Sequence, residues 1–227
     1  ALNALFSLDL EIVPRWQGVS GLFLREDASV LAIATIFRSD QDWYVFTEAV
    51  TAVVLHDYLH AGLDSAGVQI MNLADSHDWF CVVGPDAQAA MAAAAGDDIL
   101  GMRYFSFEQN LSLGLPVFRM GFCGEYEYRI LCPREKSGEL APRLLDAGRE
   151  FGIACADPAV FPLLMLEMRS RSKADIPSAG NPVTLGMHCM VSFRKQDYPG
   201  SRVLQLSKRD PVSRTLMLRF EQTGVAC

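Results

Sequence analysis

The chain has 227 residues, of which 50% are hydrophobic and 21% are charged, and its formal net charge at pH 7 is −7. This composition supports a large buried core and excludes a chain that is disordered throughout. Basic residues cluster only from Arg169 to Lys173, so the broad basic face that nucleic-acid binding requires is missing. No apolar run reaches the roughly 18 residues that a membrane-spanning helix needs, and no signal peptide is visible. We therefore expect a soluble cytoplasmic protein that binds neither nucleic acid nor membrane.

The cysteines are scattered, and no Cys-x-x-Cys pair occurs. They stand at positions 81, 123, 132, 155, 189 and 227. This spacing is typical of free thiols in a reducing compartment, and most of them lie in apolar surroundings. We therefore expect reduced and mostly buried cysteines.

Strand patterns and two helices fill the first hundred residues. Apolar spacing predicts a helix over 48–61, with Thr47 as its N-cap and Gly62 at its end. Pro85 suits the first turn of a second helix, which an alanine-rich run carries to Gly96. Strand patterns lie at 19–25, 30–38, 43–47, 68–73 and 79–83, the last two as a neighbouring pair.

The second half continues the mixture of strands and helices. A helix is predicted over 135–151, with a kink at Pro142, and another over 158–168. Residues 174–182 are predicted to be a loop, and Pro199-Gly200 a turn. Three further strand patterns lie at 104–107, 115–120 and 127–132. This order predicts an α+β fold with mixed, largely antiparallel sheets packed with helices.

His56 and His60 form the one pair with metal-site spacing. They are four residues apart in the predicted helix 48–61, so both imidazoles share one face. No Glu stands beside the first histidine, and no third ligand is obvious. We prefer a solvated helix face to a metal site, and we assign no metal.

Cys123 is the cysteine in the most turn-like context, in Gly-Phe-Cys-Gly-Glu. A carboxylate beside it would raise the pKa of the thiol and disfavour a reactive thiolate. The same turn lacks the third glycine of a phosphate-binding loop and leads into a predicted strand rather than a helix. No Gly-x-Ser-x-Gly occurs either, so the catalytic residues stay unknown at this stage.

Several segments resemble one family when taken in order. Residues 121–130, Gly-Phe-Cys-Gly-Glu-Tyr-Glu-Tyr-Arg-Ile, are similar to the signature Gly-Tyr-Thr-Gly-Glu-Asp-Gly-Phe-Glu-Ile of the glycine-cleavage T-protein family of folate-binding aminomethyltransferases. Upstream, residues 84–87 resemble the family's Gly-Pro-x-Ala at a helix start. Downstream, residues 144–148 resemble its Leu-Leu-Glu-Ala-Gly, and residues 195–200 its Lys-x-Asp-Phe-Ile-Gly. These matches keep the family's order across most of the chain.

The resemblance implies a T-protein-like folate-binding fold that is shortened at both ends and lacks most of the C-terminal barrel. It favours a first α+β subdomain over 1–110, a second over 111–210, and a C-terminal tail over 211–227 that is a remnant of the barrel domain.

The departures from the family pattern fall on residues that carry its chemistry. Ala32 stands where the family has an aspartate that assists the reaction on the folate, and Arg129 where it has a glutamate that holds the pterin. Arginine has only donors, so the hydrogen-bonding pattern inverts. Phe122 replaces a tyrosine, and Met165 replaces an arginine. Canonical aminomethyl transfer is therefore not expected.

Two functions follow from this comparison. The first is a non-canonical subunit of a hetero- or homo-oligomeric enzyme, whose folate pocket is altered and repurposed for another small anionic substrate. The alternative is a divergent one-carbon transferase, transferring methyl or aminomethyl groups, with tetrahydrofolate as its cofactor. Candidate pocket residues are Phe122, Glu125, Tyr126, Arg129, Glu167 and Arg169.

We also expect a partner, either a second copy or a different subunit. Residues 30–37 are almost wholly apolar and need cover on both faces of their sheet. If the family's flanking elements are missing, the first hairpin exposes an apolar surface and a sheet edge.

Overall fold

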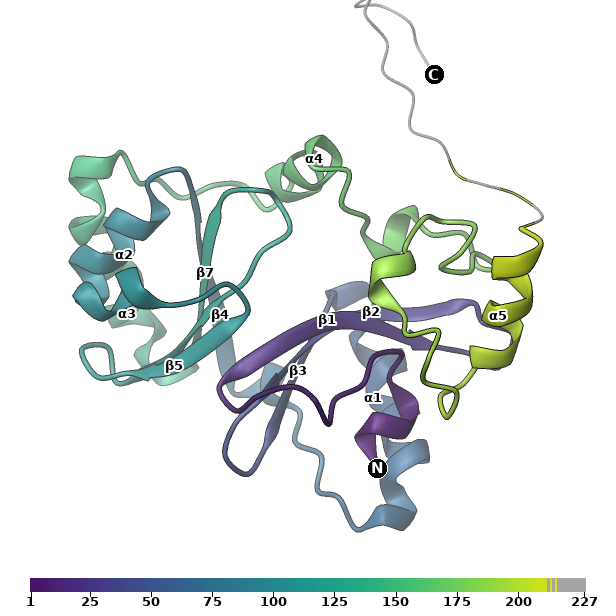
Figure 1. Ribbon diagram of the computed structural model, residues 1–227. Coiled ribbons are helices and arrows are strands. Elements are labelled where there is room, and N and C mark those ends of the chain that lie inside the picture. Colours follow the sequence, from purple (N-terminus) through teal and green to yellow (C-terminus); the bar gives the residue numbers. More distant parts are fainter. Residues whose placement is uncertain (212, 214, 216–227) are drawn as a thin grey trace, which may run out of the picture.

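One antiparallel sheet runs through the molecule (Figure 1). The computed structural model describes residues 1–211, 213 and 215. The sheet has seven strands in the order β3-β2-β1-β5-β6-β7-β4. These strands are β1 (Gln17–Leu24), β2 (Val30–Arg38), β3 (Trp43–Thr47), β4 (His77–Gly84), β5 (Ser106–Asn110), β6 (Leu115–Arg119) and β7 (Tyr126–Pro133). The helices are α1 (Ala49–Leu63), α2 (Ala87–Ala95), α3 (Arg134–Ala147), α4 (Val160–Glu167) and α5 (Ser201–Arg209).

The sheet consists of two halves that meet at a narrow junction. Strand β1 pairs with β5 only at Gln17 and Ser106. Two backbone hydrogen bonds flank this pair, from Gly18 N to Phe105 O over 2.8 Å and from Phe107 N to Trp16 O over 3.1 Å. Trp16 and Phe105 both have a positive φ, at 63° and 56°, a conformation that is uncommon outside glycine. The junction therefore redirects the chain where the two halves join.

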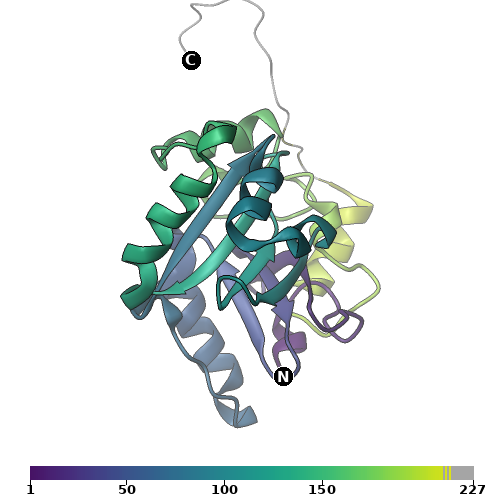
Figure 2. The same ribbon diagram turned by 90° about the vertical axis from the view of Figure 1, so that its left-hand side faces the viewer.

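Helices α1, α2 and α3 cover one face of the sheet. Helices α2 and α3 pack on the β4–β7 half around Val117, Tyr128 and Ile130, and Figures 1 and 2 both show them on the same side of these strands. Helix α1 and the N-terminal residues pack on the β1–β3 half around Phe23 and Ile36. On the opposite face, residues 176–204 cover the other side of β1 and β2.

The fold class and most elements are as predicted from the sequence, but several local predictions are wrong. Pro85 precedes the N-cap Asp86 of α2 and does not stand in its first turn. Residues 68–72 form no strand and are largely exposed. Strand β4 pairs instead with β7, which is distant in sequence. The N-cap of α1 is Glu48 rather than Thr47, whose hydroxyl bonds Thr51 instead. The helix also runs through Gly62 and ends at Leu63. Helix α5 follows the predicted turn and was not anticipated.

The expectation of an uncovered first hairpin is also wrong. Strand β2 lies inside the sheet between β1 and β3, and its residues from Val30 to Phe37 are buried. The edges of the sheet are β3 and β4. The expected boundary between the two subdomains, at residues 110 and 111, lies at the end of β5, where the chain turns toward β6. The division into two subdomains remains a proposal. Most of the expected tail over 211–227 falls outside the described residues.

The cysteines that the structure describes are free, but they are not mostly buried as expected. Cys81, Cys155 and Cys189 are exposed, while Cys123 and Cys132 are buried. Cys227 lies outside the described residues. Within the described residues, none of the helices has the length and apolar character needed to cross a membrane.

Candidate functional site

Aromatic side chains fill the sheet face opposite α1, α2 and α3. Alternation along the strands places them there, because every second residue of a strand points to the same face. Phe107 and Phe118 are stacked with centroids 4.9 Å apart, and Phe46 and Trp79 are stacked at 4.3 Å. We call this group the aromatic face, and it consists of Phe37, Tyr44, Phe46, Trp79, Phe107 and Phe118.

Two charged residues of β7 share this face. In the sheet register Arg129 lies beside Phe118 of β6 and Cys81 of β4. Glu127 is two residues earlier in the same strand, so its side chain points the same way. A carboxylate and a guanidinium therefore meet at the end of an otherwise aromatic surface.

The carboxylate of Glu127 is completely buried and surrounded by donors. Its side chain has 0% exposure and accepts a hydrogen bond from Arg129 Nε over 2.6 Å. The backbone N–H of Phe122 donates to Oε2 over 3.3 Å. The thiols of Cys123 and Cys81 donate to its two oxygens over 3.4 and 3.6 Å. These four donors occupy the acceptor sites of the carboxylate, which is what a buried charge needs in order to be tolerated.

The carboxylate of Glu127 fits beside Gly121 because glycine has no side chain. A Cβ at that position would lie 2.3 Å from Oε2 of Glu127, closer than any real contact between such atoms. Only glycine fits there, so the turn between β6 and β7 and the buried carboxylate are structurally coupled.

The guanidinium of Arg129 is held on one side and open on the other. Its Nε is bound to Glu127, and its carbon lies 5.8 Å from the ring of Trp79 and 5.6 Å from that of Phe161 in α4. The side chain keeps 17% exposure. Among the described residues, no acceptor takes a hydrogen bond from its two terminal nitrogens. A guanidinium fixed in this way offers a planar pair of donors to a carboxylate or phosphate.

The thiols beside Glu127 are held in their neutral form. Burial among protein atoms, reinforced by the negative charge of Glu127, raises the pKa of Cys81 to about 12. Cys81 still keeps access to solvent. Burial also raises the pKa of Cys123, with Glu127 adding to the effect. The predicted direction for Cys123 is confirmed, although the responsible carboxylate is Glu127 rather than Glu125. Both cysteines act here as donors, not as nucleophiles.

The structure brings together only part of the predicted site. Phe122 packs against the aromatic cluster and Arg129 pairs with Glu127. Tyr126 is 41% exposed and lies under Arg119 instead. The remaining candidates, Glu125, Glu167 and Arg169, are all exposed, and no hydrogen bond or ion pair within the described residues links them to Glu127 or Arg129.

Residues that sequence reasoning missed complete the cluster. Glu127 is its centre, and Cys81 and Trp79 come from β4. A signal for Glu127 was present, because positions 127 and 129 of one strand must share a face. Cys81 and Trp79 had no such signal, since their position depends on the pairing of β4 with β7.

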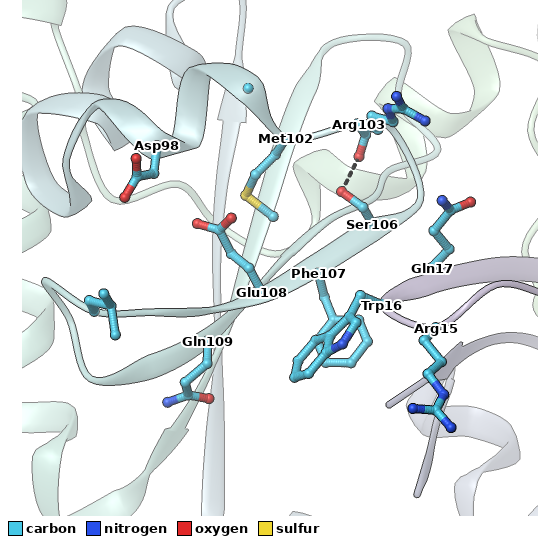
Figure 3. Close-up of a pocket in the computed structure, with 12 residues that line it drawn as sticks. Arg15, Trp16, Gln17, Asp98, Met102, Arg103, Ser106, Phe107, Glu108 and Gln109 are labelled. Atoms are coloured by element: carbon cyan, nitrogen blue, oxygen red, sulfur yellow. Dashed lines mark hydrogen bonds between the residues drawn. The ribbon is translucent and has the colours of Figure 1, made fainter. Parts of the chain in front are cut away.

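A separate hollow lies at the junction of β1 and β5, away from the Glu127–Arg129 pair, with a volume of about 560 Å³ (Figure 3). Trp16 packs on Phe107 there, with ring centroids 5.0 Å apart. Arg15 and Arg103 contribute positive charge, and Asp98 and Glu108 negative charge. None of the charged side chains that line this hollow is buried, so it has no fixed polar group comparable to the Glu127–Arg129 pair.

The sequence matches a known family model over most of its length. The model described as GCVT N-terminal domain matches residues 1–195. The aminomethyltransferase of Flavobacterium psychrophilum is 29% identical over 66% of this chain and 43% of its own length. That of Caldanaerobacter subterraneus is 23% identical over 98% of this chain and 61% of its own. Sarcosine oxidase subunit alpha of Rhizobium meliloti is 27% identical over 90% of this chain and 22% of its own length.

A solved structure supports the same conclusion for the fold. The glycine cleavage system aminomethyltransferase T from Bartonella henselae superposes with a TM-score of 0.80 and 19% identity. The match covers 91% of this chain and 57% of that one. The chain spans about half the length of the first curated relatives it matches. With the family model covering residues 1–195, this chain belongs to the family of the GCVT N-terminal domain.

Proposed function

We propose that this protein is a non-canonical subunit of a hetero- or homo-oligomeric enzyme, and that its pocket is repurposed for a small anionic molecule. The observation that carries this proposal is the ion pair on the aromatic face between the buried carboxylate of Glu127 and the partly exposed guanidinium of Arg129. By the resemblance described above, Arg129 occupies the position of the family's pterin-holding glutamate.

Folate binding in the family's manner is disfavoured at this pair. A pterin presents N–H groups that need an acceptor, and Arg129 has none to offer. Glu127 is an acceptor, but its side chain has 0% exposure and four donors within the protein already engage it. Ala32, at the position of the family's aspartate, is a fully buried methyl group. A site whose polar groups mismatch a ligand loses several kcal/mol of affinity.

An anion suits the open side of Arg129. Its terminal nitrogens form a planar fork, and Trp79 and Phe161 limit how the guanidinium can turn. The carboxylate of Glu127 offsets part of the positive charge of Arg129, so we expect modest affinity for an anion. The planar fork should favour ligands with two acceptor oxygens in one plane. A flat carboxylate that also contacts the aromatic face fits this arrangement better than a bare inorganic ion.

Helix α4 supports the proposal of a partner subunit. None of its residues is buried, and Leu163 and Leu166 are 63% and 60% exposed. Figure 1 shows α4 standing above the sheet, between the β4–β7 half and the segment that leads to α5. An apolar helix in this position is typical of an interface. The free cysteines favour a reducing compartment, which is why we place the subunit in the cytoplasm.

Calorimetric titration of the purified protein tests the ligand. We expect weak or no heat with tetrahydrofolate, and saturable binding of a small aromatic carboxylate such as benzoate. Arg129→Gln should abolish that binding, while Arg149→Gln should keep it, because Arg149 is 81% exposed and its ion pair within the described residues is with Asp146. Benzoate binding that survives Arg129→Gln contradicts the proposal. Light scattering at low micromolar concentration tests the partner, and a stable monomer that does not associate with any copurifying subunit would contradict it.

The alternative function is a divergent tetrahydrofolate-dependent one-carbon transferase. Family membership and the position of Phe122 beside the aromatic face favour it. A micromolar or tighter dissociation constant for tetrahydrofolate, lost in Phe122→Ala, would establish this function in place of the first.

A further inference from the structure

His56 and His60 stand side by side on α1. They are one helical turn apart, and a hydrogen bond joins their Nε2 atoms over 3.2 Å. A metal ion between them would take the place of the shared proton. The ring centroids are 4.4 Å apart at an interplanar angle of 63°. His60 is exposed and the side chain of His56 is 41% exposed. Solvent therefore reaches the point between the two nitrogens.

The separation of these nitrogens matches two ligands of one metal ion. Imidazole nitrogens bind Zn²⁺ at about 2.0–2.1 Å, so two of them lie about 3.3 Å apart at a tetrahedral angle and about 2.9 Å apart at a right angle. The observed distance falls between these limits. The backbone of α1 already holds both side chains, so little further ordering is needed.

Asp57 adds a negative charge beside the pair. Its Oδ1 lies 3.6 Å from Nδ1 of His56, which is too long for a direct hydrogen bond. Its charge favours a cation next to His56. The described residues hold no group of three side chains that could bind a metal, so water must complete the coordination.

We propose that His56 and His60 form a surface site for a divalent ion that prefers imidazole ligands, such as Zn²⁺ or Ni²⁺. This replaces the preference for a solvated face drawn from the sequence, because the structure brings the two Nε2 atoms to 3.2 Å. The site lies on the outer side of α1, and it is independent of the proposed ligand at Arg129. Binding bridges two turns of the helix and so stabilises α1 against unfolding.

Titration calorimetry of the full chain with NiCl₂, and separately with ZnCl₂, tests this site. We expect one equivalent to bind. His56→Gln and His60→Gln should each weaken binding by about tenfold or more, because each removes half of the protein ligands. His77→Gln is the matched control, since that histidine lies in β4 and contacts Ser76 instead. The melting temperature should rise with Ni²⁺ in the unaltered protein and in the control only.

Two outcomes overturn the proposal. One is the absence of saturable binding of either ion. The other is binding that persists in both the His56→Gln and the His60→Gln variants, which would place the ion elsewhere in the molecule.

Discussion

Arg129 Nε donates to Glu127 Oε1 over 2.6 Å, and both side chains point to the same face of β7. The carboxylate is fully buried while the guanidinium keeps an open edge. This pair links the turn at Gly121, the thiols of Cys81 and Cys123, and the aromatic face into one cluster.

Glu127→Gln should destabilise the protein. The variant keeps the shape of the side chain but leaves the charge of Arg129 without a buried partner, which costs about 2–4 kcal/mol after allowing for partial solvent access. Urea unfolding followed by circular dichroism measures the change. Asp146→Asn removes the carboxylate of an exposed pair and should cost at most about 1 kcal/mol. If Glu127→Gln and Asp146→Asn lower the free energy of unfolding equally, the ion pair of Glu127 and Arg129 stabilises the protein no more than an exposed pair does.

Gly121→Ala should also destabilise, because the new methyl group would collide with the carboxylate of Glu127. We expect a loss of about 1–3 kcal/mol, as for other overpacked sites. Gly138→Ala is the control. Its Cβ meets nothing within 4 Å in α3, so this change should stabilise by about 0.8–1.0 kcal/mol through helix propensity. If the unfolding midpoints of both variants move in the same direction, the predicted collision between the new methyl group at position 121 and Glu127 is contradicted.

Stability should fall as the pH rises above 9. The folded pKa of Cys81 is raised from 9.0 to about 12, so its contribution is fully present below pH 9 and is lost as the pH rises toward 12. Tyr198 is raised from 10.0 to about 12 by burial and acts in the same direction. Urea midpoints between pH 8 and pH 11 should therefore decline. The decline should be shallower in Cys81→Ser and unchanged in Cys155→Ser, and a Cys81→Ser protein with the original slope would disprove the assignment.

Lys195→Gln should loosen the N-terminal residues. The ammonium group of Lys195 donates to the carbonyl oxygens of Phe6 and Leu8 over 2.8 and 3.3 Å, and to the side chain of Asn3 over 3.0 Å. Without it these acceptors lose their partner, at a cost of about 1–3 kcal/mol. Hydrogen exchange should accelerate in residues 3–8. Lys136→Gln, at an exposed position of α3, should leave exchange in that segment as it was.

Local sequence patterns determined much of this fold. The hairpin of β2 and β3 and the start of α2 depend on neighbouring residues, namely an apolar run with a polar turn and a Gly-Pro step before an alanine-rich run. The family resemblance also rested on short segments, and the comparisons confirm it. These features were predictable because the interactions that define them are close in sequence.

The candidate site was decided by the tertiary structure. Residues 68–72 have strand-like composition but form no strand. Their expected partner β4 pairs with β7 instead and stands at the edge of the sheet, with no described strand on its other side. That same long-range pairing brings Cys81 and Trp79 beside Arg129. Alternation along β7 could place Glu127 on the face of Arg129, but not show that the carboxylate is buried or that two thiols donate to it. Burial and partners depend on which strands and helices meet, and that is a property of the whole folded chain rather than of any one segment.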